Sequence, residues 1–244
     1  MKFFGGAIPG LAMRELRSSW ASAVPYVIII FFILPLSIWL FEAQHYFALN
    51  EATLRPYFSL FPVLCTIAIP ALTMRSWAEE RKSRTLELLL TFPLSEWELV
   101  LGKFFAAYGI FVAAVIFTLP LPLGLMLLGR FDLGVLFSEY LGVLFFGSGA
   151  TALGLLCSAL AKNQINAFLL GFVILLSSTL ANQAIALDGL PAILADSIAV
   201  FSLAFHYETF SKGVLDSRDI SYFIFATALP LFLNTRVLLY RKWS

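Results

Sequence analysis

Six long and nearly uncharged apolar runs constrain what this chain can fold into. They lie at roughly 21–41, 57–74, 104–128, 137–160, 165–187 and 220–239. At about 1.5 Å per residue in a helix, each run can cross a hydrocarbon core about 30 Å thick. Only helices and closed barrels satisfy their backbone hydrogen bonds in lipid, and continuous apolar runs lack the alternation of barrel strands. The sequence therefore predicts an all-α, polytopic membrane protein with six transmembrane helices.

The composition points to the same class of protein. The chain is 60% hydrophobic and 13% charged, whereas a soluble domain is about half apolar and about a quarter charged. Its net charge is +1 without a basic run, so no nucleic-acid partner is expected. The first apolar run is longer than a signal-peptide core and no A-x-A-like site follows it, so we expect it to be a retained span. Cys65 and Cys157 lie in apolar runs and are interpreted as buried small hydrophobes.

The distribution of Lys and Arg predicts the orientation. With a cytoplasmic N-terminus, 12 of the 16 basic residues are cytoplasmic: Lys2, Arg14, Arg17, Arg75, Arg81, Lys82, Arg84, Lys103, Lys162, Arg236, Arg241 and Lys242. The other 4 are outside: Arg55, Arg130, Lys212 and Arg218. The positive-inside rule then predicts that both termini are cytoplasmic.

The segment before the first span is predicted to be an amphipathic helix over residues 9–20, lying in the cytoplasmic membrane interface. Helical spacing places Met13, Leu16 and Trp20 on one face. The other faces carry polar residues, namely Arg14, Glu15, Arg17 and Ser18. An unstructured basic tail is the alternative.

Two further segments carry packing signals. Small residues recur along the fourth span, at Gly147, Ala150, Thr151, Gly154 and Ser158. Such residues let helices approach closely in membranes, so we expect them to pack within the bundle, with a substrate path as the alternative. Residues 188–219 are apolar but interrupted by polar residues and a proline, and are interpreted as an extracytoplasmic, partly re-entrant segment.

Charged residues cluster in residues 76–103, which are predicted to form a cytoplasmic helical hairpin. Ser95 and Glu98 fit a capping box that starts the second helix. Charged residues stand beside a Leu-rich edge: Glu79, Glu80, Arg81, Lys82, Arg84, Glu87, Glu96, Leu86, Leu88, Leu89 and Leu90. A mixed surface of this kind suits a docking element for a soluble partner. A solvated loop with interfacial leucines is the alternative.

The absence of several functional motifs from the sequence narrows the range of possible functions. The span interiors contain no Asp, Glu, His, Lys or Arg, so a proton relay and an intramembrane catalytic pair are not expected. There is no G-x-x-x-x-G-K-[ST] motif for binding ATP. His206 and Glu208 offer too few nitrogen ligands, at irregular spacing, for zinc. If the chain moves anything uphill, another chain must supply the energy.

The segment "PALTMRSWAEERKSRTLELLLTFPLSEWELVLGKF" resembles the signature region of ABC-2-type permeases, specifically the gliding-motility-associated branch. The resemblance extends to "RELRSSWASAVPYVI", "HYETFSKGVLDSRDISYF" and "LYRKW", in order along nearly the whole chain. Arg84 stands where the family commonly has Gly. The resemblance implies one permease domain over residues 1–244, with a type V exporter-like fold in a bacterial inner membrane.

The resemblance also implies the partners. Such permeases pair with a second copy or a homologous permease and bind two ABC ATPase subunits, which hold ATP and Mg while this chain holds no cofactor and is no enzyme. The implied ATPase-coupling contacts lie in the hairpin: Glu79, Glu80, Arg81, Arg84, Thr85, Glu87, Ser95 and Trp97. The interfacial helix, with Arg14, Glu15, Arg17 and Trp20, also contacts the ATPase. The expected function is export or movement of a substrate. The alternative is an ATPase-driven signal or force relay to extracytoplasmic partners. The cargo stays open, because a Phe- and Leu-rich interior suits an apolar or amphipathic substrate and a closed dimer seam equally well.

Overall fold

The computed structural model describes the chain except for residues 1–6, 45–52, 84–94, 130, 186–199 and 243–244. The described part is helical throughout and contains no strand. Its elements are α1 (Ala7–Trp20), α2 (Val24–Ile38), the π-helix η1 (Trp39–Ala43), α4 (Arg55–Ser59), α5 (Phe61–Thr73), α6 (Arg75–Lys82), α8 (Glu96–Thr118), α9 (Pro120–Met126), α10 (Leu133–Leu160), α11 (Gln164–Ile185), α13 (Leu203–Ser211) and α14 (Ser217–Lys242).

Six helical stretches among the described residues are long and apolar enough to cross a membrane, which confirms the predicted fold class. They are Val24–Ala43, Arg55–Lys82, Glu96–Met126, Leu133–Leu160, Gln164–Ala181 and Ser217–Tyr240. Three of them are built from two or three helices in succession, such as α8 and α9, where Pro120 begins the second helix. Proline lacks the N–H that would continue the helical ladder, so a break before it is expected.

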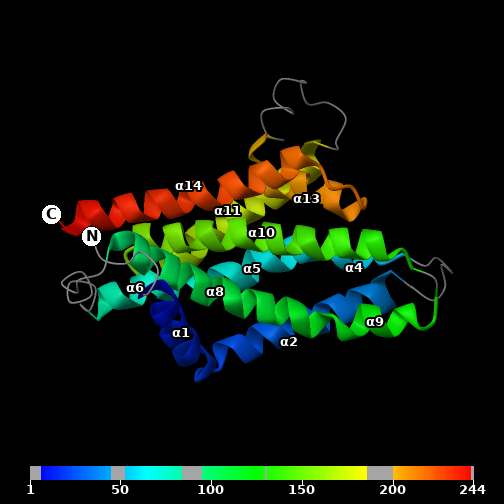
Figure 1. Ribbon diagram of the computed structural model, residues 1–244, viewed down its shortest axis with the longest axis horizontal. Coiled ribbons are helices and arrows are strands. Elements are labelled where there is room, and N and C mark those ends of the chain that lie inside the picture. The colour runs from blue at the N-terminus through cyan, green and yellow to red at the C-terminus, as the bar shows by residue number, and fades with distance from the viewer. Residues whose placement is uncertain (1–6, 45–52, 84–94, 130, 186–199, 243–244) are drawn as a thin grey trace.

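Helix α10 is the centre of the bundle, with α5, α8, α11 and α14 packed around it (Figure 1). Its small residues make this close packing possible. A Cβ on Gly147 would lie 2.0 Å from the ring of Phe111 on α8, and one on Gly154 would lie 2.4 Å from Thr73 Oγ1 on α5. The prediction that the small residues of this span pack within the bundle is confirmed at these two positions.

Helix α13 lies against the first half of α10. A Cβ on Gly149, in the middle of α10, would meet the Leu203 side chain at 3.3 Å, and one on Gly142 would meet Phe210. The start of α13 is tied to α11, where Ser202 Oγ donates to the Ser178 carbonyl at 2.8 Å. Helix α13 therefore begins at the depth of the centre of α10 and runs back to the bundle end where α10 begins. The predicted re-entrant segment, 188–219, includes α13, whereas residues 188–199 lie outside the described residues.

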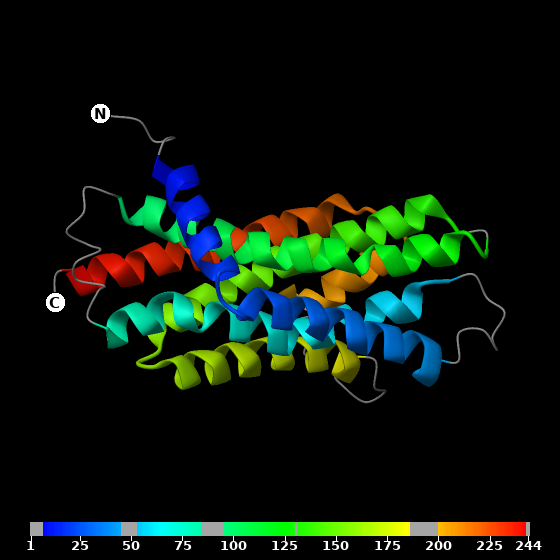
Figure 2. The same cartoon turned by 90° about the horizontal axis from the view of Figure 1, so that it is seen from below.

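The two ends of the bundle differ in the elements they carry. Helix α1, helix α6, the start of α8 and the end of α14 lie at one end, here called the α6 end (Figure 1). Helix α1 crosses the bundle obliquely there (Figure 2). The start of α4, the start of α10 and the end of α13 lie at the other end, here called the α13 end. Most of the described Lys and Arg residues belong to the α6 end.

Candidate functional site

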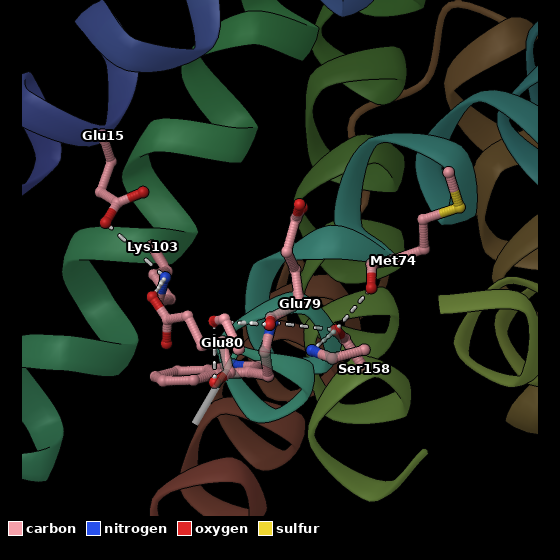
Figure 3. A network of polar contacts seen from close by, with 9 residues as sticks. Glu15, Met74, Glu79, Glu80, Lys103 and Ser158 are labelled. Atoms are coloured by element: carbon pink, nitrogen blue, oxygen red, sulfur yellow. Dashed lines mark hydrogen bonds and ion pairs between the residues drawn. The ribbon is translucent and has the colours of Figure 1, made fainter. Parts of the chain in front are cut away.

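A buried lysine joins three helices at the α6 end. Lys103 on α8 has a side chain only 5% exposed, and its Nζ lies 2.6 Å from Glu80 Oε1 on α6. The same Nζ lies 3.7 Å from Glu15 Oε1 on α1 and 4.9 Å from the ring centroid of Trp77. Figure 3 shows Glu15, Lys103 and Glu80 pointing toward one another from their three helices. Since a buried ammonium needs opposite charge around it, this group holds α1, α6 and α8 together.

The local sequence around Lys103 places it at this junction. Helix α8 begins at the predicted capping box, which is present: Ser95 Oγ accepts from the Glu98 N–H and Glu98 Oε2 accepts from the Ser95 N–H. One turn later, Gly102 lets α1 come close, because a Cβ there would lie 2.6 Å from Leu11 Cδ2. The missing side chain at Gly102 thus brings Glu15 of α1 within reach of Lys103.

The N-terminus of helix α6 is capped by a residue of another helix. Met74, its N-cap residue, makes no capping hydrogen bond with its own side chain. Ser158 Oγ of α10 instead accepts from the N–H groups of Trp77 and Ala78, at 3.1 and 3.3 Å, and donates to the Met74 carbonyl (Figure 3). Ser158 thereby does the work of an N-cap residue from a distant part of the chain and fixes α6 to α10.

The end of α10 is held by α6 in turn. The Arg81 guanidinium donates to the carbonyl oxygens of Ala159 and Ala161. These carbonyls lie at the C-terminus of α10, where the helix leaves acceptors without partners and carries partial negative charge. Arg81 and Ser158 together connect α6 to the central helix at two points.

A polar groove opens beside this junction, with a volume of about 280 Å³. Helices α1, α2, α5, α6 and α8 all contribute to its lining, including Glu15, Arg75, Glu79, Glu80 and Lys103. Glu79 is exposed, whereas the Glu80 side chain is 20% exposed. Neighbouring positions on α6 therefore differ: Glu79 faces outward and Glu80 faces Lys103.

The structure brings most of the predicted site residues to the α6 end. Arg14 and Arg17 are exposed on α1, and Trp20 lies edge-on to Tyr26. Trp97 is exposed and lies 6.0 Å from the ring of Phe232 on α14. The other three predicted contacts, Arg84, Thr85 and Glu87, lie outside the described residues, as does the leucine-rich edge of the hairpin.

One sequence-based expectation about the charges is wrong. The charged hairpin, 76–103, is predicted to present its charges to a soluble partner or to solvent. Lys103 instead lies in the protein interior, where it attracts Glu80 and, more weakly, Glu15. The periodicity of α8 contained the signal, because Lys103 shares a buried stripe with Leu99, Ala107 and Ile110 at helical spacing.

The polar residues near α13 form local pairs. His206 Nδ1 lies 2.6 Å from Asp219 Oδ1, and its ring stacks on Tyr222. Glu208 pairs with Lys212 at 2.9 Å. No group of three or more His, Cys, Asp or Glu residues is close enough together to hold a metal ion in the described part of the chain.

Comparisons with known proteins give this helical architecture a family. The family model described as "ABC-2 family transporter protein" matches residues 21–203, well over half of the chain. The protein named "Probable multidrug ABC transporter permease YbhR" of Escherichia coli K12 is 32% identical over 122 residues, which cover 50% of this chain and 33% of that protein. The protein of the same name in Escherichia coli O157:H7 matches equally well. The chain thus spans about a third of the length of these relatives. Members of the matched family are membrane permease subunits without a catalytic site of their own, and this chain, with six apolar membrane-length helices among its described residues, belongs to the ABC-2 family of transporter proteins.

Proposed function

We propose that this chain couples ATP hydrolysis by separate ATPase subunits to the movement of a substrate across the bacterial inner membrane. The observation that carries the proposal is the junction at Lys103, where α1, α6 and α8 are held together at one end of the bundle. A partner that pushes on α6 would move α8 and α1 with it. Motion of one part of a protein is transmitted to another when rigid elements move together.

The connection from α6 to α10 extends this path to the centre of the bundle. Ser158 and Arg81 fix α6 to α10 through hydrogen bonds that include buried groups. Helix α10 in turn packs against α5, α8, α11, α13 and α14. A displacement of α6 would therefore reach the helix that most of the others contact.

The predicted contact residues divide into two roles in this proposal. Glu79 and Trp97 are exposed at the α6 end and would contact the ATPase directly, together with Arg84, Thr85 and Glu87. Glu80, Arg81 and Ser95 are bound within the chain and would hold the docking element in shape. On α1, exposed Arg14 and Arg17 would face the partner, while Glu15 faces Lys103.

The remaining parts of the proposal follow from family membership and charge. The α6 end would be cytoplasmic, because most of the basic residues lie there. Two permease chains would assemble with two ATPase subunits, and a place in the gliding-motility-associated branch is our proposal from the sequence resemblance. The cargo we propose is amphipathic, in keeping with the apolar span interiors and with the word "multidrug" in the relatives' name.

The test is to purify the tagged full chain in mild detergent, identify co-purifying ATPases, and reconstitute the complex into vesicles. The proposal expects ATP-dependent movement of a fluorescent amphipathic dye across the membrane. Hydrolysis that responds only to an added extracytoplasmic protein, with no dye or lipid moved, would instead favour the force-relay alternative. Activity of the chain without any ATPase would overturn both.

A further inference from the structure

A small pocket at the α13 end contains a buried carboxyl group that the transport proposal does not use. The pocket has a volume of about 200 Å³ and lies between α4, the start of α10 and the end of α13. Its charged lining residues are Arg55, Asp132, Glu139 and Lys212. The volume is below the 300 to 1,000 Å³ that is typical of sites for drug-sized ligands, so the pocket suits a small polar group.

The buried carboxyl group of Glu139 indicates that this pocket binds a ligand. Its side chain is 1% exposed, and its Oε1 has no hydrogen-bond partner among the described residues. A buried carboxyl oxygen without a donor is costly, and the great majority of buried polar groups are satisfied. The neighbouring carboxylate is already used, because Asp132 Oδ1 accepts from the Gly134 N–H at the start of α10. Glu139 therefore needs a hydrogen-bond donor that the described part of the chain does not supply.

Basic groups line the same pocket. Arg55 is exposed, and its Nε donates to the Ser211 carbonyl at 3.1 Å, which holds the guanidinium in place. Lys212 lies at the end of α13, where Gly213 adopts φ +78° and a Schellman turn forms: the Gly213 N–H donates to the Phe210 carbonyl and the Val214 N–H donates to the Thr209 carbonyl. The pocket thus offers an acceptor at Glu139 and a guanidinium held in place at Arg55, whereas the Lys212 ammonium is paired with Glu208.

The surroundings place this pocket where phospholipid headgroups lie. It is at the end of the membrane-crossing stretches that begin at Arg55 and Leu133. Leu133, next in sequence to the lining residue Asp132, is 69% exposed, and Leu127 and Leu128, just after α9, are 89 and 76% exposed. Exposed leucines at this level suit acyl chains, because apolar surface in a membrane protein faces lipid.

We propose that this pocket binds the headgroup of an aminophospholipid, with its primary ammonium on Glu139 and its phosphate on Arg55. The ammonium supplies the donor that Glu139 lacks, and charge-assisted hydrogen bonds of this kind are stronger than neutral ones. Arginine presents several donors in a fixed fork that matches phosphate oxygens. A headgroup with only one of the two charges would leave one side of the pocket unmatched. The inference depends on the membrane placement of the helices and is independent of the ATPase.

Native mass spectrometry of the purified full chain tests the proposal. The detergent-solubilised protein is offered equal amounts of phosphatidylethanolamine, phosphatidylcholine and phosphatidylglycerol with identical acyl chains. We expect preferential retention of phosphatidylethanolamine, because the trimethylated choline group has no N–H and the glycerol group has no charge. Glu139→Gln should reduce that preference about tenfold, equivalent to about 1.4 kcal/mol. Glu42→Gln is the matched control, since Glu42 is exposed on η1 and does not line the pocket; it should keep the preference.

A second variant and a competition experiment complete the test. Arg55→Gln should weaken retention of phosphatidylethanolamine severalfold while leaving its ratio to phosphatidylcholine intact, and it tests the pocket even if Glu139→Gln does not fold. Soluble O-phosphoethanolamine should compete poorly, because it lacks acyl chains. Equal retention of the three lipids by the unaltered chain, or an unchanged preference in Glu139→Gln, overturns the proposal. Displacement of the lipid by micromolar O-phosphoethanolamine overturns the assignment to a lipid.

Discussion

Replacing Lys103 with Met tests the junction at the α6 end by removing its charge while keeping most of its volume. The variant removes the ion pair between Lys103 and the partly buried Glu80, and also removes the cation–π contact with Trp77 and the weaker contact with Glu15. Loss of one partner from a buried pair costs about 3–5 kcal/mol, a cation–π contact contributes about 0.5–2 kcal/mol, and a half-exposed ion pair contributes less than about 1 kcal/mol.

Solvent reduces this sum. The Glu80 side chain is 20% exposed and lines the polar groove, so water can hydrate its carboxylate once Lys103 is gone. The added methionine also buries well in place of the lysine chain. We therefore expect Lys103→Met to lower the free energy of unfolding by about 2–4 kcal/mol.

The assay is unfolding of the detergent-solubilised chain by titration with SDS, followed by tryptophan fluorescence. Lys103→Met combined with Glu80→Gln should recover about 1–2 kcal/mol, because the double variant also removes the charge of the carboxylate that lost its ion pair with Lys103. The control is Lys82→Met, at the exposed end of α6, which should change stability by less than about 0.5 kcal/mol. If Lys103→Met costs no more than this control, the junction does not hold the three helices together.

Two other predictions concern the packing around α6 and α10, measured by the same titration. Ser158→Ala removes the acceptor for the Trp77 and Ala78 N–H groups and should cost about 1–3 kcal/mol, whereas no loss would show that these groups find other partners. Gly154→Ala places a Cβ 2.4 Å from Thr73 Oγ1 and should cost about 1–3 kcal/mol. Gly124→Ala is its control, because nothing lies within 4 Å of a Cβ at that helical position, and it should be neutral or stabilising. Equal effects of the two alanines would rule out close packing as the reason for the glycine.

The architecture could be predicted from the sequence because membrane physics leaves few choices. Runs of about 20 apolar residues without charge have to be helices, so the six crossing stretches follow from hydropathy alone. Their ends are harder to predict, since the stretch around α5 extends beyond the predicted 57–74 to cover Arg55–Lys82. The capping box at Ser95 was predictable for a different reason: its two partners are three residues apart, so the pattern is local.

The candidate site was predictable in outline only. The charge-rich hairpin predicted which end of the bundle holds the cluster of charged residues. The ion pair between Lys103 and Glu80 was not predictable, because it joins residues 23 positions apart on different helices. Ser158 is a stronger case, since it caps a helix about 80 residues away in sequence. Spacing within one helix cannot reveal such contacts. The missing partner of Glu139 likewise depends on how α4 and α13 pack around it.

The most direct test of the account asks whether the exposed surface at the α6 end binds the ATPase. Charge reversal of Glu79, which is exposed on α6, is compared with charge reversal of Glu42, which is exposed at the opposite end of the bundle. ATPase retained by the tagged full chain in mild detergent and its rate of ATP hydrolysis are measured for both variants. The account predicts that Glu79→Lys loses the ATPase or its coupled hydrolysis while Glu42→Lys keeps both. Retention of the ATPase and of full coupled hydrolysis by Glu79→Lys, or an equal loss in Glu42→Lys, would contradict the account.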